Sequence, residues 1–245
     1  MYLSTKLFVL KKVKRFLTPL HMQEYSLIFV EIVLGMFVSI FSFLFFITFA
    51  EDVLEKEKIF MDTAIAHAIY ALRTPELTSV MQVLSFLGGE FLVPATIVVT
   101  IFLFWKGYRR EAALFSFAII MGNFLNIIIK YLLKVPRPTI DPLTVESFYS
   151  FPSGHAMNSF IFYASISYLV FHFTRRKKIS VLIAFLSGVI VFLIGLSRVY
   201  LGVHYRSDVL AGFVAGFWWF VTVILIDKTV LFYQVFKKRK QKKLF

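Results

Sequence analysis

Long apolar runs, separated by short polar segments, dominate the pattern of hydrophobic and polar positions along the chain. Six of these runs are predicted to be membrane-spanning helices, at about residues 27–50, 91–105, 112–133, 153–173, 179–196 and 209–232. The first run exceeds the roughly 20 apolar residues that a helix needs to cross a bilayer, and Glu31 is the charged residue within it. The chain is therefore predicted to be an all-α, polytopic membrane helix bundle with six transmembrane helices.

The second apolar run has two possible starts. It begins either at Phe91, which makes it short, or earlier, near Val80. Gly88, Gly89 and Pro94 are expected to interrupt the regularity of the longer version, because glycine pairs and proline are common causes of helix kinks.

Short interfacial helices are expected outside the spans. Residues 1–25 mix basic with apolar side chains, which predicts an amphipathic helix in the interface or a disordered basic tail. Residues 51–90 form the longest connection, predicted to be extracytoplasmic, and apolar side chains at helical spacing predict a surface helix over 62–73. With a basic cytoplasmic tail at 236–245, the chain is predicted to be a single membrane domain, 1–245.

Composition and charge support the membrane class. Hydrophobic residues make up 59% of the chain and charged residues only 17%, which is unlike a soluble domain. The net charge of +13 comes largely from basic clusters at 6–15, 106–110, 175–178 and 237–243, which fall on one side if six spans alternate. By the positive-inside rule both termini are predicted to be cytoplasmic, so the charge indicates topology and not a nucleic-acid partner.

Candidate chemistry is concentrated between residues 130 and 208. Polar and charged side chains gather at the ends of the predicted spans there: Lys130, Arg137, Ser153, Gly154, His155, Arg198, His204 and Asp208. Such residues are unfavourable near hydrocarbon, so their recurrence indicates a functional site. Alternation of the spans puts all of them at the same, extracytoplasmic end.

Three cations and one helix start suit the binding of a phosphoryl group. Lys130, Arg137 and Arg198 can neutralise its charge, and arginine does so with forked donors. The fourth span begins just after Pro152, so free backbone N–H groups at the helix start can bind a phosphate oxygen. In this interpretation Gly154 allows close approach of the backbone, and Ser153 adds a hydroxyl donor.

The histidines and their neighbours suggest distinct roles. His204 and Asp208 are four residues apart, so the carboxylate can accept a hydrogen bond from one ring nitrogen and leave the other free.

Asn123 and Asn126 share a helical face with Lys130, and they either bridge helices or position the lysine. The loop 139–151, which contains Glu146, lies between two motifs and could shape headgroup choice. The absence of cysteine excludes thiolate chemistry.

The three motifs together resemble a known signature. They read K-x6-R-P, P-S-G-H and S-R-x5-H-x3-D, in that order, over about a third of the chain. This pattern resembles that of the type 2 phosphatidic acid phosphatase (PAP2) superfamily, in particular its membrane lipid phosphatase branch. Size and layout are similar to the bacterial phosphatidylglycerophosphate phosphatase B-like members, so a bacterial plasma membrane is the expected location.

The resemblance implies a mechanism for the matched positions. His204 would be the nucleophile that forms a phosphohistidine, His155 the general acid and then base, and Asp208 the residue that orients His204. Lys130, Arg137, Ser153, Gly154 and Arg198 would bind the phosphate, with no metal or cofactor. The substrate would be a lipid phosphate such as phosphatidylglycerophosphate, phosphatidic acid or undecaprenyl pyrophosphate.

Two other functions remain open at this point. A lipid-linked phosphotransferase would use the same site but pass the phosphoryl group to an acceptor other than water. A non-catalytic lipid or anion binding or transport protein would use the basic residues alone, but it would not need two histidines and a carboxylate. The pattern leaves the preferred lipid and the oligomeric state undetermined.

Overall fold

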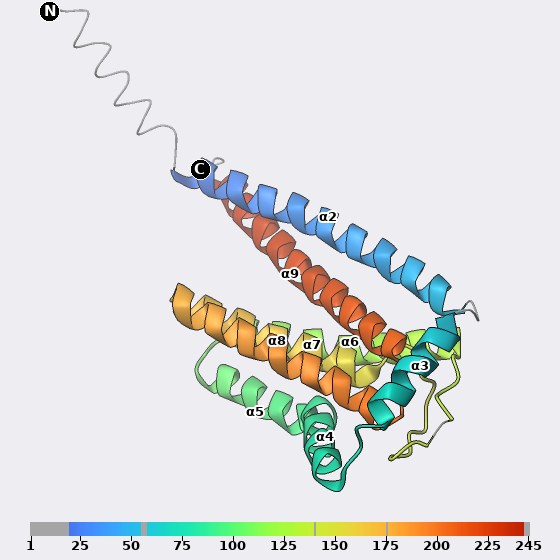
Figure 1. The fold of residues 1–245 in the computed structure, drawn as a ribbon. Coiled ribbons are helices and arrows are strands. Elements are labelled where there is room, and N and C mark those ends of the chain that lie inside the picture. The colour runs from blue at the N-terminus through green and yellow to red at the C-terminus, as the bar shows by residue number, and fades with distance from the viewer. Residues whose placement is uncertain (1–19, 55–57, 140, 175, 243–245) are drawn as a thin grey trace, which may run out of the picture. The chain divides into compact units, whose positions relative to one another are not determined.

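The computed structural model describes residues 20–54, 58–139, 141–174 and 176–242. Every regular element in these ranges is a helix, which confirms the predicted all-α class (Figure 1). The helices are α2 (Leu20–Leu54), α3 (Lys58–Tyr70), α4 (Pro75–Gly88), α5 (Leu92–Trp105), α6 (Arg109–Leu133), α7 (Gly154–Thr174), α8 (Lys177–Tyr200) and α9 (Arg206–Lys242).

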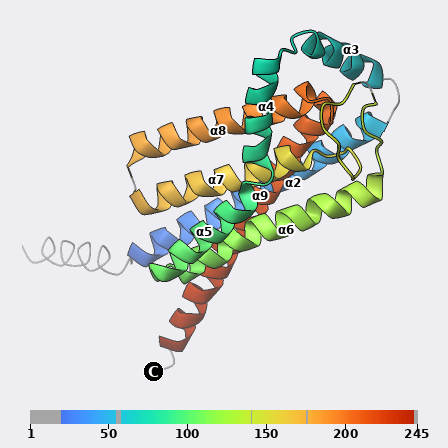
Figure 2. The same ribbon diagram turned by 90° about the horizontal axis from the view of Figure 1, so that it is seen from below.

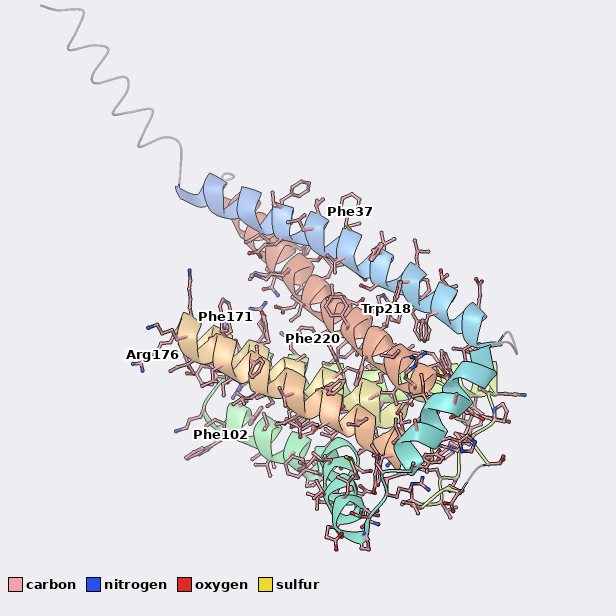
Figure 3. The ribbon with its side chains drawn as sticks, in the orientation of Figure 1. Phe37, Phe102, Phe171, Arg176, Trp218 and Phe220 are labelled. Carbon is pink, nitrogen blue, oxygen red and sulfur yellow. The ribbon has the colours of Figure 1, made fainter. Side chains whose placement is uncertain are left out.

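The helices account for the predicted membrane spans. Five segments among the described residues are long and apolar enough to cross a bilayer: Ile28–Glu51, Arg109–Leu133, Gly154–Thr174, Lys177–Tyr200 and Arg206–Gln234. The pair α4 and α5 makes a sixth candidate if it is counted as one span. Large apolar side chains such as Phe102, which is 52% exposed, cover the outside of the helices (Figure 3). Such a surface fits a lipid environment.

The second span is a bent pair of helices. α4 and α5 meet at an angle of 43°, and the break falls after Gly88, as the glycine pair predicted (Figure 2). α5 begins at Leu92, directly after the predicted start at Phe91. The longer version, which includes α4, begins at Pro75 and not near Val80, because Thr74 caps α4 by accepting a hydrogen bond from the backbone N–H of Leu77. Pro94 does not interrupt α5, since the first turn of a helix tolerates proline.

Other boundaries differ from prediction in ways that matter for the site. α8 continues to Tyr200, so Arg198 lies within this helix instead of beyond it. α7 begins at Gly154, one residue after the predicted start of the fourth span. α9 begins at Arg206, which places His204 in the turn before it. The surface helix expected over 62–73 is α3, which lies a few residues earlier.

The chain forms two compact units, which we describe separately. The smaller comprises 1–38 and 224–245. In it, Lys228 donates a hydrogen bond of 2.7 Å to Glu31, so this predicted intraspan charge is paired. Residues 1–19 and 243–245, which include most of the predicted interfacial segment, lie outside the described residues. The larger unit, 39–223, contains every predicted site residue.

Close packing of α9 on α7 fixes the middle of the larger unit. Met157, Ile161, Ala211 and Ala215 are fully buried between these helices. A Cβ atom added to Gly212 would lie 2.7 Å from the carbonyl oxygen of Ser153. The glycine is therefore required for the close approach that brings the start of α9 beside the start of α7.

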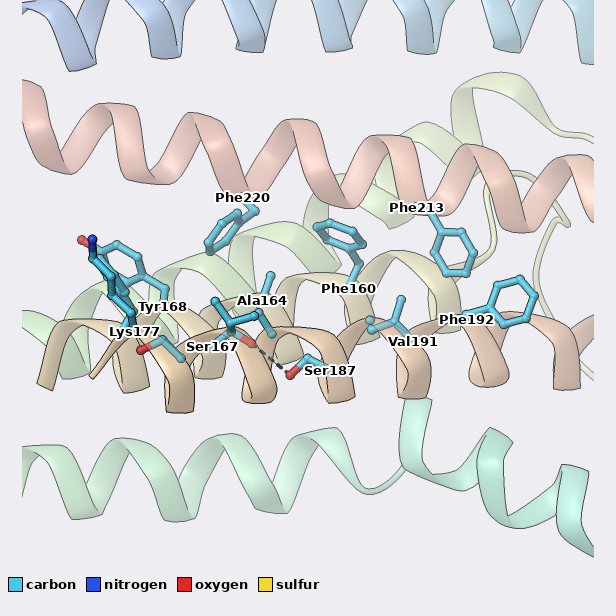
Figure 4. Close-up of a pocket in the computed structure, with 15 residues that line it drawn as sticks. Phe160, Ala164, Ser167, Tyr168, Lys177, Ser187, Val191, Phe192, Phe213 and Phe220 are labelled. Atoms are coloured by element: carbon cyan, nitrogen blue, oxygen red, sulfur yellow. Dashed lines mark hydrogen bonds between the residues drawn. The ribbon is translucent and has the colours of Figure 1, made fainter. Parts of the chain in front are cut away.

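An apolar groove lies elsewhere in the same unit, between α7, α8 and the part of α9 that belongs to this unit (Figure 4). Its volume is about 780 Å³, and its lining includes Phe160, Phe213 and Phe220. A Cβ atom added to Gly188 in this groove would meet nothing within 4 Å. Two glycines of the same unit thus occupy opposite environments, one fully packed and one open.

This contrast gives a matched pair of substitutions. Gly212→Ala is expected to lower the free energy of unfolding by about 1–3 kcal/mol, because the backbone atoms it would meet cannot rotate away. Gly188→Ala should not lower stability and should raise it by up to about 1 kcal/mol, because alanine favours the helix more than glycine does. Thermal denaturation of both variants in detergent checks the expectation, and equal melting temperatures would contradict it.

Candidate active site

The predicted site residues converge on one end of the larger unit. They come from the last turns of α6 and α8, the first turns of α7 and α9, the turn before α9, and the loop 134–153. Figure 2 shows this loop beside the ends of these helices. Helices that alternate in direction bring residues far apart in sequence to one end, so the predicted convergence is present.

His204 lies in a hydrogen-bond network that defines which of its ring nitrogens carries the proton. Its Nδ1 atom lies 3.4 Å from Asp208 Oδ2 and 3.2 Å from the hydroxyl of Ser150, and its Nε2 atom lies 3.3 Å from Arg137 Nη1. A guanidinium group can only donate, so Nε2 must carry the lone pair and Nδ1 the proton. These contacts thus place the lone pair of the ring on Nε2.

Asp208 and Ser150 hold this arrangement in place. Asp208 is fully buried, and its Oδ2 atom accepts hydrogen bonds from the Ser150 hydroxyl and from the backbone N–H of Tyr205, the latter at 2.9 Å. Since the Ser150 hydroxyl donates to Asp208, it is free to accept from His204 Nδ1–H. Sequence reasoning missed Ser150, because a serine next to a motif carries no distinguishing signal.

The environment keeps His204 neutral. Burial lowers its pKa well below the usual value of 6.5, and the positive charges of Arg137, Lys130 and Arg198 lower it further. A neutral imidazole retains the lone pair that nucleophilic attack requires. The effect also shows that the three cations lie within electrostatic reach of the same ring.

Backbone carbonyl groups compensate two of the cations. Lys130 donates to the carbonyls of Tyr149 and Ser150, the second at 3.2 Å. Arg137 donates to the carbonyl of Phe148 and, at 2.7 Å, to that of Val203. The loop and the turn before α9 are therefore folded around these charges.

Arg198 is bound by side chains and keeps one donor available. It is 2% exposed, and its two terminal nitrogens donate to Ser85 and Glu146. Its Nε atom is buried with no hydrogen-bond partner among the described residues. An unpaired buried donor is unfavourable, so this atom marks a place where an oxyanion would be stabilised. Ser85 comes from α4, and the sequence had not connected it with the site.

The start of α7 differs in detail from the prediction. The backbone N–H of Ser153 donates to the carbonyl of Asp208 at 2.9 Å, and its hydroxyl accepts from the N–H of Ala156 at 3.4 Å. Ser153 therefore caps the helix and ties it to α9, in addition to any contact with phosphate. The N–H groups of Gly154 and His155 follow it at the helix N-terminus, where anions are favoured.

Two asparagines support this helix start. Asn126 donates to the carbonyl of Pro152 at 3.3 Å, and Asn123 accepts from Asn158 at 2.9 Å. Of the two roles considered, the bridging of helices is the one that these contacts show. Asn126 also lies against Gly154, where an added Cβ would be 3.0 Å from its Oδ1 atom.

His155 borders a cavity that the glycine break helps to form. A Cβ atom added to Gly89 would lie 2.5 Å from His155 Nε2, so only glycine leaves room for the ring. The cavity has a volume of about 650 Å³, and His155, Gly154 and Lys130 lie at its polar part. Its remaining lining is largely apolar and comes from α5 and α6, including Val93, Ile97, Ile119, Ile120 and Ile127.

Comparisons with known proteins show the family to which the chain belongs. Residues 111–232 match the model of the PAP2 superfamily. Phosphatidylglycerophosphatase B of Bacillus subtilis (strain 168) is 35% identical over 190 residues, which cover 77% of this chain and 94% of the relative. An undecaprenyl-diphosphatase of Sulfolobus acidocaldarius is 29% identical over 163 residues, which cover 62% of this chain and 72% of the relative.

A solved structure shares the fold. The crystal structure of a transmembrane PAP2 type phosphatidylglycerolphosphate phosphatase from Bacillus subtilis matches with a TM-score of 0.74 and 34% identity, over 78% of this chain and 96% of that chain. These findings define a multi-pass membrane enzyme of the phosphatase class. The chain belongs to the PAP2 superfamily, as its three motifs had indicated.

The lowered pKa of His204 makes stability depend on pH. Below about pH 6.5 the unfolded chain gains a proton on this residue that the folded chain does not bind, so stability falls as the pH falls. The loss is at most about 1.4 kcal/mol per pH unit for one group. We expect the melting temperature to decrease from about pH 7.5 to about pH 5.5, and to decrease less in His204→Gln. Parallel curves for the two proteins would contradict this expectation.

Proposed function

We propose that this protein hydrolyses a phosphomonoester or diphosphate of a membrane lipid through a phosphohistidine on His204. The observation that carries the proposal is the cavity described above, which joins the catalytic end to apolar surface on α5 and α6. Val93, Ile97 and Ile120 line it and are more than half exposed on the outside of the bundle. A ligand with a phosphate head and an apolar chain matches both parts.

In the first half of the proposed reaction, His204 Nε2 attacks phosphorus and the bond from phosphorus to the lipid oxygen breaks. His155, protonated, gives its proton to the leaving oxygen. Arg137, Arg198 and Lys130, with the N–H groups at the start of α7, bind the phosphoryl oxygens. Asp208 and Ser150 hold the Nδ1–H tautomer and stabilise the positive charge that develops on the ring.

In the second half, His155 accepts a proton from water, whose oxygen attacks phosphorus. The bond from phosphorus to His204 breaks, and inorganic phosphate leaves. The cations and the helix dipole supply charge stabilisation of the kind that Mg²⁺ gives in other phosphoryl transfers. Among the described residues, no three or more His, Cys, Asp or Glu side chains are grouped in a way that could hold a metal ion.

The proposed orientation places this site on the extracytoplasmic side. Its support is the charge pattern, because the basic clusters at 106–110 and 175–178 flank the helix ends opposite to His155 and Arg198. The substrate then lies in the outer leaflet. Phosphatidylglycerophosphate, phosphatidic acid and undecaprenyl pyrophosphate are candidates, and the names of the relatives favour the first and the third.

Phosphate release by the purified protein in detergent tests the function. With EDTA present, the parent chain is expected to release phosphate from at least one of the three lipids, and His204→Ala to lose at least about 10³-fold in kcat. His67→Ala is the control, because His67 is exposed on α3 and its ring packs against Tyr70. Phosphorylated acceptor in place of free phosphate would instead indicate a phosphotransferase.

The role of the apolar cavity can be tested separately. Ile97 and Ile101 lie one turn apart on α5, and both are exposed, but only Ile97 lines the cavity. Ile97→Trp is expected to raise KM for a long-chain lipid phosphate by about tenfold, as changes in a hydrophobic pocket commonly do. The same substitution should not change KM for a short-chain soluble phosphate ester.

Ile101→Trp is the matched control and should not change KM for either substrate. Steady-state kinetics with both substrates give the comparison. An equal effect of Ile97→Trp on the two substrates would show that the chain of the lipid does not use this cavity.

A further inference from the structure

Glu146 reaches from the loop 134–153 to both arginines of the site. One carboxylate oxygen accepts a hydrogen bond from Arg198 Nη2, and the other lies 3.8 Å from Arg137 Nη2. The three side chains are 27%, 3% and 16% exposed respectively, so water screens these interactions only partly. A single carboxylate therefore lies between the two guanidinium groups.

The position of Glu146 matches one that a phosphoryl group would use. The side of a guanidinium that forms two parallel hydrogen bonds presents one Nε–H and one terminal N–H. In Arg198, Glu146 holds the terminal Nη2 while Nε is buried without a partner among the described residues. A phosphoryl group that bound Arg198 through both Nε and Nη2 would compete with the carboxylate for Nη2.

The loop allows this displacement without disrupting the fold. Its backbone is tied on both sides of Glu146, because Leu143 N–H donates to the carbonyl of Leu201 and Ser150 N–H to that of Val135, each at 2.9 Å. Between these two hydrogen bonds the loop lies at the surface, and Val145, next to Glu146, is 98% exposed. A rotation of the Glu146 side chain would move its carboxylate away from both arginines and leave these two backbone hydrogen bonds in place.

We propose that Glu146 is a built-in competitor of the substrate phosphate, a role that rests on the proposed function of the site. Its carboxylate compensates Arg137 and Arg198 when no phosphate is bound, and the incoming phosphoryl group displaces it. The same competition weakens the binding of free inorganic phosphate and so favours release of the product. Glu146 then sets the affinity of the site for oxyanions, with no part in bond making or breaking.

A purely structural role for Glu146 predicts the opposite result. If the carboxylate served to hold the arginines in their binding positions, its removal would weaken the binding of oxyanions. Competition predicts that removal strengthens it. The sign of the change in affinity therefore separates the two roles.

The test measures binding of orthovanadate and of inorganic phosphate to the purified full-length protein in detergent, by calorimetry. Glu146→Gln is expected to lower both dissociation constants by roughly tenfold, the effect of releasing one hydrogen-bonded charge pair. Glu146→Ala, which also removes the amide, should act in the same direction. Asp141→Asn is the control, since Asp141 lies in the same loop but pairs with Arg73, at 3.0 Å.

Kinetics provide a second readout. In Glu146→Gln the KM for the lipid phosphate is expected to fall, inhibition by inorganic phosphate to strengthen, and kcat not to rise. Unchanged or weaker oxyanion binding in both Glu146 variants would overturn the inference, even with full lipid phosphatase activity in the parent chain. Tighter oxyanion binding without any lipid hydrolysis by the parent would instead overturn the proposed function and leave the competition established.

Discussion

The compensation of buried charge is the constraint on which the site depends. Lys130, Arg198 and Asp208 are nearly or fully buried at one end of an apolar bundle, where an unpaired charge is strongly unfavourable. The bundle itself offers few polar partners, so the loop 134–153 supplies them through its carbonyl groups, Ser150 and Glu146. The path of this loop follows from the charges that it has to satisfy.

The same hydrogen bonds that stabilise the charges also define the chemistry. Arg137 lies beside Nε2 of His204 and can only donate, while Ser150 and Asp208 hold Nδ1. One tautomer satisfies all of these contacts, and it directs the lone pair toward the cations. Stability and the proposed reactivity thus have a common origin, because both require a neutral ring with a fixed orientation.

Close approach of backbones brings the polar end and the apolar cavity together. Gly212 lets α9 contact the start of α7, and Gly89 leaves room for the ring of His155 at the break between α4 and α5. The break also directs α5 so that its apolar side chains continue the cavity that His155 borders. A phosphate site and a hydrocarbon-lined cavity therefore share one wall, which suits the lipid substrate that we propose.

The sequence by itself determined the class and the order of the apolar spans, and it indicated which motif residues could share one site. Long apolar runs leave few alternatives to membrane helices, and alternation of the spans puts Lys130, His155 and His204 at one end. Only the tertiary structure decided which atoms meet. Ser85, Ser150 and Glu146 entered the site through packing of α4 and a loop without periodicity, and no local pattern encodes such contacts. Their partners are distant in sequence, so their roles follow from how the helices pack and where the loop finds its hydrogen bonds.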